Sequence, residues 1–191
     1  MAAGLIRRRI LGLLAAGLLA ACATTPVPAP APVLEPNPDA VSRLFLVRHG
    51  EKEAGTDPAL SAAGVARAAT LAALLQDEGV TEVWSTDTRR TEQTAAPTAA
   101  EFGLPIQIYD ASTLPAFSTW LLDTPGVKLV VGHSNTTDAL AALLGADPGP
   151  EIVEATEFDR LYVIDIDASG VVRSRVVRYG APSVSASGDT E

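Results

Sequence analysis

The sequence predicts a three-layer α/β fold, in which helices cover both faces of a mainly parallel sheet and a β-hairpin follows at the C-terminal end. Two observations support this prediction. Between residues 43 and 145, short apolar runs alternate with longer segments rich in alanine and leucine, as strands alternate with their covering helices. The runs at residues 44–47 and 129–131 are apolar at every position, which is typical of strands buried on both faces.

Local signals place the individual elements along the chain. Ser61 is a suitable N-cap and Gly79 a suitable stop for a helix between them, and Gly145 closes a later helix. In chain order we expect a strand at 44–47, a helix at 62–78, a strand at 81–85, a helix ending near 102, a strand at 106–109, a helix at 114–122, a strand at 128–131, a helix at 136–144, and hairpin strands at 161–166 and 171–177. In the first helix, the face toward the sheet is expected to consist of Val65, Ala68, Ala69, Ala72 and Leu75.

The N-terminal segment has the pattern of an export signal. Three arginines and a ten-residue apolar run precede small residues and Cys22, so residues 1–21 are expected to be a signal peptide that is too short to span a bilayer comfortably. The position of Cys22 resembles the lipobox of bacterial lipoproteins, which implies lipidation of this cysteine; an ordinary signal peptide with a coincidental cysteine is the alternative. Because Ala23 stands where an aspartate would signal inner-membrane retention, we expect a lipid anchor on the periplasmic face of the outer membrane.

The remaining boundaries follow from composition. Prolines at every second or third position make residues 23–40 an extended linker, a reading favoured over a ligand for a proline-binding domain. The folded domain is expected at residues 41–180. Residues 181–191 are small and polar, and we expect a disordered tail there. Since Cys22 is the only cysteine, the chain forms no internal disulfide.

The charge balance excludes one class of partner. The chain carries a formal charge of −9, and removal of residues 1–21 with their three arginines leaves 11 basic and 23 acidic residues, a charge of −12. A nucleic-acid partner requires a basic surface, so we expect none. A small phosphate ester is compatible with this balance, because a local pocket of arginines binds an anion even in an acidic protein.

The chain contains only two histidines, and each follows an expected strand. His49 comes directly after residues 44–48, and His133 comes directly after Gly132. Because the carboxyl ends of parallel strands lie at one edge of a sheet, both imidazoles are expected in one pocket. A neutral imidazole is a nucleophile, and the guanidinium of Arg48 offers a planar set of donors for phosphate oxygens.

Four segments in fixed order resemble the histidine phosphatase superfamily, which includes the cofactor-dependent phosphoglycerate mutases. They are Leu46-Val47-Arg48-His49-Gly50-Glu51, then Leu60-Ser61-Ala62-Ala63-Gly64, then residues 85–95, and finally Val131-Gly132-His133. The resemblance covers nearly all of residues 43–178. It implies transfer of a phosphoryl group to a histidine and then to water, without a metal or another cofactor, on a small phosphorylated substrate.

The resemblance also implies roles for single residues. His49 would be the nucleophile, Arg48 and Arg90 would bind the phosphoryl oxygens, and His133 would share charge across the same group. Arg90 is preferred to Arg89 because it stands four residues before Thr94, the spacing of the family's Arg-x-x-x-Thr pattern.

Two further positions are expected to bind substrate. Gly50 lacks a side chain and allows close approach of the backbone. Asn135 opens a helix whose N-terminal dipole suits an anion. The short segments 51–59 and 110–118 predict an open, shallow pocket.

The proton donor for the leaving group stays open. Asp110, just past the third strand, is the first candidate, and Glu51 and Glu157 are weaker ones. The glutamate that larger family members carry between the second arginine and the second histidine is not found, which argues against phosphoglycerate mutase activity. Other readings are a zinc site built on the two histidines, which Arg48 and Arg90 would oppose, and a non-catalytic envelope lipoprotein that binds a phosphate ligand.

Overall fold

The computed structural model describes Met1 and residues 32–183 of the chain. The expected signal peptide, Cys22 and most of the expected linker lie outside these described residues. Within the described part of the chain, no helix is both long and apolar enough to cross a bilayer.

Six strands and four α-helices make up the described domain. In chain order they are β1 (Ala40–Arg48), α1 (Ala62–Leu75), β2 (Glu82–Ser85), α2 (Arg89–Phe102), β3 (Ile106–Ile108), α3 (Leu114–Asp123), β4 (Gly126–Gly132), α4 (Ser134–Leu143), β5 (Arg160–Asp167) and β6 (Val172–Arg178), with a short 3-10 turn at Ala111–Thr113. Every element expected from the sequence is present, with ends that differ by a few residues.

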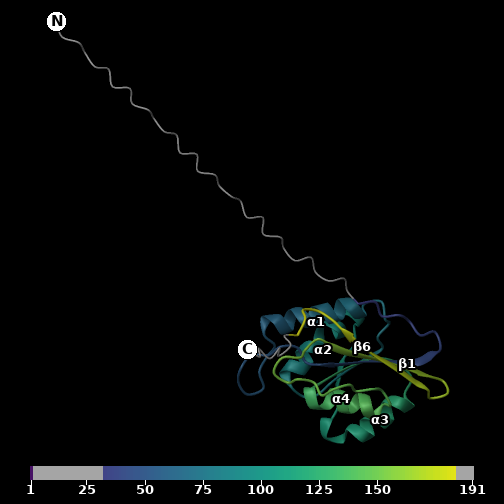
Figure 1. Ribbon diagram of the computed structural model, residues 1–191. Coiled ribbons are helices and arrows are strands. Elements are labelled where there is room, and N and C mark those ends of the chain that lie inside the picture. The colour runs from purple at the N-terminus through teal and green to yellow at the C-terminus, as the bar shows by residue number, and fades with distance from the viewer. Residues whose placement is uncertain (2–31, 184–191) are drawn as a thin grey trace. The chain divides into compact units, whose positions relative to one another are not determined.

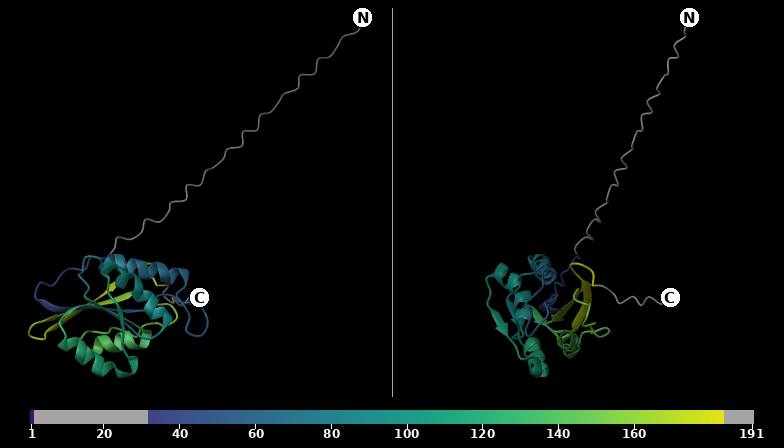
Figure 2. Two further views of the ribbon diagram at one scale, coloured as in Figure 1. Left: turned by 180° about the vertical axis from the view of Figure 1, so that it is seen from behind. Right: turned by 90° about the vertical axis from the view of Figure 1, so that its left-hand side faces the viewer.

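The strands form one mixed sheet in the order β3-β2-β4-β1-β5-β6. The first four of these strands run parallel, whereas β5 is antiparallel to both of its neighbours, β1 and β6. Figures 1 and 2 show α1 and α2 on one side of the sheet and α3 and α4 on the other. The predicted three-layer fold with a C-terminal hairpin is therefore confirmed.

The alternation of side chains along β1 divides the core into two layers. Leu44 and Leu46 pack with the helices α3 and α4, whereas Phe45 and Val47 pack with α1 and α2. All four side chains are fully buried. This burial on both faces explains why the central strand is apolar at successive positions.

The buried face of α1 differs from the predicted one. Of the five predicted residues, Ala68 and Leu75 are buried and Ala72 is half-buried, whereas Val65 and Ala69 are exposed. Gly64, Arg67 and Leu71 are buried as well. The helix is turned because Arg67, a charged residue, finds buried partners: a carboxylate and two backbone carbonyls. Apolar periodicity alone does not reveal such a position.

Both ends of the domain reach beyond the expected boundaries. Leu34, inside the expected linker, is buried, and the carbonyl of Glu35 accepts hydrogen bonds from Arg43 and Arg175. At the other end, Ser183 lies in the expected tail, yet its hydroxyl accepts the backbone N–H groups of Phe158 and Asp159. The folded domain thus extends on both sides of residues 41–180.

The direction of β5 brings a loop to the carboxyl end of β1. Leu161, near the start of β5, pairs with Val47, near the end of β1. The segment 144–159, which leads into β5, therefore arrives at the sheet edge where β1 ends. The end of β6 lies at this edge as well, because Arg178 pairs with Arg160.

Candidate active site

The register between β1 and β4 brings the two histidines together. Arg48 pairs with Gly132, and each histidine follows directly after one of these residues. The backbone N–H of His49 donates to the Gly132 carbonyl at 3.0 Å. As a result, the rings of His49 and His133 lie 5.5 Å apart between centroids, at an interplanar angle of 68°. The helices that follow, α1 and α4, lie on opposite faces, which makes this edge a topological switch point where ligands bind.

The ring of His49 is oriented by the carbonyl of its neighbour. Its Nδ1 lies 2.7 Å from the Gly50 carbonyl oxygen. Since a carbonyl only accepts hydrogen bonds, Nδ1 carries the proton in this contact, and Nε2 of the neutral ring keeps a free electron pair. Nε2 therefore has the electron pair that a nucleophile or a hydrogen-bond acceptor requires.

The ring of His133 is held by two polar side chains. Its Nε2 lies 2.9 Å from the Thr86 hydroxyl, and its Nδ1 lies 3.3 Å from Nη2 of Arg90. A guanidinium has no acceptor atom, so Nδ1 accepts and Nε2 donates in the neutral ring. Thr86 in turn donates to Thr91 at 3.0 Å, and this chain of hydrogen bonds fixes the orientation of His133.

Both imidazoles are neutral at physiological pH. Burial lowers the pKa of His49 to about 3, and the charges of Arg48 and Arg90 act in the same direction. Burial likewise lowers the pKa of His133 to about 4, again with help from the two arginines. A neutral histidine beside fixed guanidinium charges is the state in which a nitrogen nucleophile attacks an anionic phosphoryl group.

Arg90 points into the site and Arg89 does not. Nη2 of Arg90 contacts His133, and Nη1 lies 3.8 Å from the carboxylate of Asp57. The side chain of Arg89 is exposed. Thr94, one helical turn after Arg90, donates to the Arg90 carbonyl at 2.7 Å and accepts the Gly50 N–H at 3.0 Å, which ties α2 to the loop that carries His49.

Arg48 is buried at the same edge, with a relative exposure of 2%. Its Nη1 donates to the Glu157 carbonyl at 2.9 Å, and its guanidinium lies 4.2 Å from the centre of the Phe158 ring. Burial lowers its pKa to about 10, so it stays a cation at neutral pH. Among the described residues, Nε of Arg48 and Nε of Arg90 are buried without a hydrogen-bond partner. Two such donors beside the histidines fit an anionic ligand.

The two residues expected to bind substrate lie at different places. Asn135 is exposed on the first turn of α4, next to His133. Gly50 is buried, its N–H is taken by Thr94, and a Cβ there would lie 3.0 Å from the backbone of Gly64. The contacts of Gly50 therefore favour packing against α1, rather than the close approach to substrate that we expected.

The three expected proton donors are all occupied. The Asp110 carboxylate accepts the backbone N–H of Ser112, and these hydrogen bonds lower its pKa, which disfavours proton donation. Burial raises the pKa of Glu51, but the hydrogen bonds from Arg67 outweigh burial and hold this pKa below its usual value. Glu157 shows the same balance, with hydrogen bonds from Val153, Arg178 and Arg160 prevailing over burial.

Sequence reasoning missed several residues at this edge. Thr86, Phe158 and Glu154 lie there, the last of them beside Arg48 in a cavity of about 570 Å³. The sequence could have predicted Thr86, because this residue directly follows β2, just as each histidine directly follows a strand. Phe158 and Glu154 have none, since they reach the site only through the antiparallel pairing of β5.

The zinc reading finds no support in the arrangement of ligands. Within residues 32–183, no group of three or more histidine, aspartate or glutamate side chains is placed to hold a metal ion. Fold and site instead define an α/β protein in which two neutral histidines and two arginines lie at one edge of the sheet.

Comparison with known proteins finds a family model that matches part of the chain. Residues 44–111 match the family model of the histidine phosphatase superfamily (branch 1). No curated protein matches the sequence. The matched segment contains Arg48, His49 and Arg90, and over this part of the chain it supports the resemblance to the histidine phosphatase superfamily.

Solved structures of phosphatases share the fold. A candidate alpha-ribazole-5'-P phosphatase from Escherichia coli is 19% identical with a TM-score of 0.59, and the match covers 72% of this chain and 96% of that chain. A candidate phosphohistidine phosphatase, SixA from Agrobacterium tumefaciens, is 25% identical with a TM-score of 0.54, over 74% of this chain and 99% of that chain. A mycobacterial glucosyl-3-phosphoglycerate phosphatase is 17% identical with a TM-score of 0.53, over 74% and 99% of the two chains.

Proposed function

We propose that this chain is a metal-independent phosphatase that hydrolyses a small phosphorylated substrate through a phosphohistidine at His49. The observation that carries the proposal is the meeting of a neutral His49, with its free Nε2, and His133 at 5.5 Å, beside the guanidiniums of Arg48 and Arg90. The phosphatase names of the structural neighbours support the reaction class.

The reaction has two displacements. In the first, the Nε2 electron pair forms a bond to phosphorus, the bond from phosphorus to the leaving atom breaks, and the leaving group takes a proton. In the second, a water oxygen attacks phosphorus, the P–N bond breaks, and the electron pair returns to Nε2 of His49 while water releases a proton. The products are inorganic phosphate and the dephosphorylated leaving group.

The arginines supply the electrostatic part of catalysis. Negative charge spreads over the phosphoryl oxygens in the transition state, and fixed cations that already point at these oxygens lower the barrier. Arg90 and Arg48 each have a buried Nε without a partner among the described residues, and both groups would pair with the bound phosphoryl group. His133 lies beside the same group, and its Nε2–H, which donates to Thr86, would have to leave this partner to donate to a phosphoryl oxygen.

The nature of the leaving atom divides the proposal into two cases. A phosphomonoester releases an alkoxide that needs a proton, whereas a phosphohistidine-type substrate releases an imidazole that leaves easily. Both would be phosphoryl donors for the proposed reaction, and the neighbour described as a phosphohistidine phosphatase makes the second worth testing.

The test is hydrolysis of p-nitrophenyl phosphate, combined with trapping of the phosphoenzyme. The wild type is expected to turn over and to carry an acid-labile, base-stable label on His49. His49→Ala is expected to lose both, and Arg89→Ala serves as the matched control with both retained. If His49→Ala hydrolyses the substrate as fast as the wild type, the proposal is wrong.

A second candidate is a protein that binds a phosphate ligand without turnover. The four site residues, Arg48, His49, Arg90 and His133, would bind a phosphate ligand equally well if no reaction followed. In this case the wild type would bind inorganic phosphate in a calorimetric titration, and no hydrolysis would be found with any phosphorylated substrate offered.

We also propose, from the lipobox-like sequence alone, that Cys22 is lipidated and that the enzyme is anchored in the bacterial envelope, on the periplasmic face of the outer membrane. Labelling of cells with radioactive palmitate tests this. The wild type is expected to incorporate label and to fractionate with membranes, and Cys22→Ser to do neither. Label in Cys22→Ser equal to that in the wild type would contradict the lipid anchor.

A further inference from the structure

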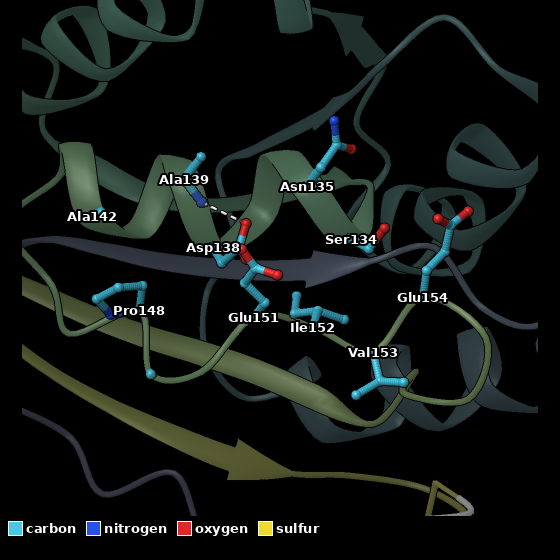
Figure 3. A pocket seen from close by; sticks show the side chains of 11 residues that line it. Ser134, Asn135, Asp138, Ala139, Ala142, Pro148, Glu151, Ile152, Val153 and Glu154 are labelled. Carbon is cyan, nitrogen blue, oxygen red and sulfur yellow. Dashed lines mark hydrogen bonds between the residues drawn. The ribbon is translucent and has the colours of Figure 1, made fainter. Parts of the chain in front are cut away.

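An open cavity of about 760 Å³ lies beside the candidate active site, between α4 and the loop that follows this helix. It begins at Ser134 and Asn135, the two residues after His133, and extends along α4 to Ala142. Figure 3 shows the loop residues 148–154 running along the opposite wall, with Glu154 at the end near Ser134. The cavity is therefore continuous with the end of α4 that carries the histidine.

The lining combines apolar surface with negative charge. Ile152 and Val153 belong to the apolar part, together with Ala139, Ala142 and Pro148. The charged residues in the lining are three acids, Asp138, Glu151 and Glu154, and no lysine or arginine is among the lining residues. A phosphoryl site held by arginines thus adjoins a cavity of the opposite charge.

Glu154 stands where this cavity meets the phosphoryl site. It lines the first cavity and also the second, of about 570 Å³, where it faces Arg48, Lys52 and Phe158. Its negative charge acts on both Arg48 and His133. Glu154 takes part in none of the ion pairs found among residues 32–183.

A second observation points to a ligand at this junction. Arg48 is 2% exposed and lines the second cavity, and its buried Nε has no hydrogen-bond partner among the described residues. A ligand whose anionic end pairs with Arg48 would have Glu154 beside it. In-line displacement requires the leaving group to lie opposite His49, and the first cavity, which begins at the two residues after His133, offers room for it.

Building on the proposed function, we infer that Glu154 is a specificity-determining residue that selects phosphorylated substrates whose leaving group is an organic cation. The phosphoryl group occupies the site of the two histidines, and the leaving group extends into the cavity along α4. An aliphatic stem fits the apolar surface there, and an ammonium group balances the carboxylate of Glu154. An anionic leaving group meets this carboxylate unfavourably.

The exposure of Glu154 determines how strongly its pairing with a cationic leaving group should change kcat/KM. Glu154 is exposed, so its attraction for a cation is partly screened by water. An interaction of this kind changes kcat/KM by about twofold to fivefold. The comparison must therefore use two substrates that differ in charge alone.

Phosphocholine and 3,3-dimethylbutyl phosphate form such a pair, because a trimethylammonium group replaces a neutral tert-butyl group of the same shape. The wild type is expected to prefer phosphocholine by about twofold to fivefold in kcat/KM. Glu154→Gln is expected to bring the ratio near one, and Glu154→Lys to invert it. Glu101→Gln, an exposed position in α2 on the other face of the sheet, is the control and keeps the wild-type ratio.

The outcomes separate this inference from the function on which it rests. A wild-type ratio near one, or a ratio that Glu154→Gln leaves unchanged, overturns the role of Glu154 while hydrolysis itself stands. An equal loss on both substrates in Glu154→Gln shows that this residue acts independently of the charge of the leaving group and also overturns the inference. If the wild type hydrolyses neither substrate nor p-nitrophenyl phosphate, the proposed function fails and the inference fails with it.

Discussion

Arg67 binds the carboxylate of Glu51 through both Nε and Nη2, at distances of 2.7 to 3.1 Å. Glu51 lies two residues after His49. The remaining donors of Arg67 reach the carbonyls of Tyr179 and Ala181, at 2.9 and 2.8 Å. One buried guanidinium thus joins the loop that follows His49, helix α1 and the segment that follows β6.

Replacement of Arg67 by methionine is expected to destabilise the domain strongly. It leaves a partly buried carboxylate and two carbonyls without their donor, and breaking such a pair costs about 3 kcal/mol or more. Urea denaturation of Arg67→Met measures the loss. Arg173→Met, in an exposed ion pair on β6, is expected to change stability by less than about 1 kcal/mol.

A double-mutant cycle separates the Glu51 contact from the two carbonyl contacts. If the bidentate pair is coupled, Glu51→Gln and Arg67→Met together cost less than the sum of the single changes. Additive losses would contradict coupling between Arg67 and Glu51. The kcat of Glu51→Gln on p-nitrophenyl phosphate then shows whether the reaction depends on the position of the loop that joins His49 and Glu51.

Gly64→Ala is expected to destabilise the domain, although alanine favours helices over glycine by about 1 kcal/mol. A Cβ at this position would lie 2.1 Å from the Glu51 carbonyl oxygen, which is backbone and cannot turn away. We expect a loss of about 1 to 3 kcal/mol in urea denaturation, with a lower kcat because the displaced loop carries His49. Val65→Ala, at an exposed position of the same helix, is the control. A Gly64→Ala protein as stable as the wild type would argue against this contact.

Arg90→Ala is expected to lower kcat/KM for p-nitrophenyl phosphate by about 10²- to 10³-fold, the usual effect of removing one transition-state donor. Arg89→Ala, one position earlier, should stay within about twofold of the wild type, because the Arg89 side chain is exposed and has no contact with the histidines. Equal effects of the two substitutions would show that Arg90 has no special role.

The pH dependence of stability should reveal the neutral state of His49. Its pKa is about 3 in the folded protein and about 6.5 in the unfolded chain, so the unfolded state binds the proton first as the pH falls. Stability is therefore complete above pH 6.5 and declines as the pH falls toward 3. Between pH 7.5 and 5 the wild type should lose about 2 kcal/mol more than His49→Gln.

The measurement is urea denaturation of both proteins at the two pH values. NMR provides an independent check, because the chain has only two histidines to assign. Both imidazoles should stay neutral at pH 6. A titration midpoint of His49 near 6.5 would contradict its burial and its neutral state.

The order of elements could be predicted because each depends on local sequence. Apolar runs mark β1 and β4, and the glycines at the helix ends mark their stops. The packed face of α1 could not be predicted, because burial of Arg67 depends on the carbonyls of Tyr179 and Ala181, which are more than a hundred residues away. The domain ends were misplaced for the same reason, since Leu34 and Ser183 are fixed by distant partners.

The proton-donor candidates show the limit of sequence reasoning at the site. Asp110 follows a strand of the same sheet, yet its carboxylate is used by Ser112. Glu154 follows no strand and was not considered, although it lines both cavities beside the histidines. A sequence shows which residues directly follow an expected parallel strand. It does not show that a later strand, such as β5, pairs antiparallel to β1 and so places the loop before it at the same edge.

The sequence by itself determined the α/β fold, the two histidines at the ends of parallel strands and the choice of Arg90 over Arg89, because hydrophobic periodicity and motif spacing act over short distances. Only the tertiary structure decided which carboxylates are free, where Arg67 is buried and what lines the cavity beside His133. Those features depend on the antiparallel insertion of β5 next to β1, and strand pairing between distant segments is set by packing of the whole domain.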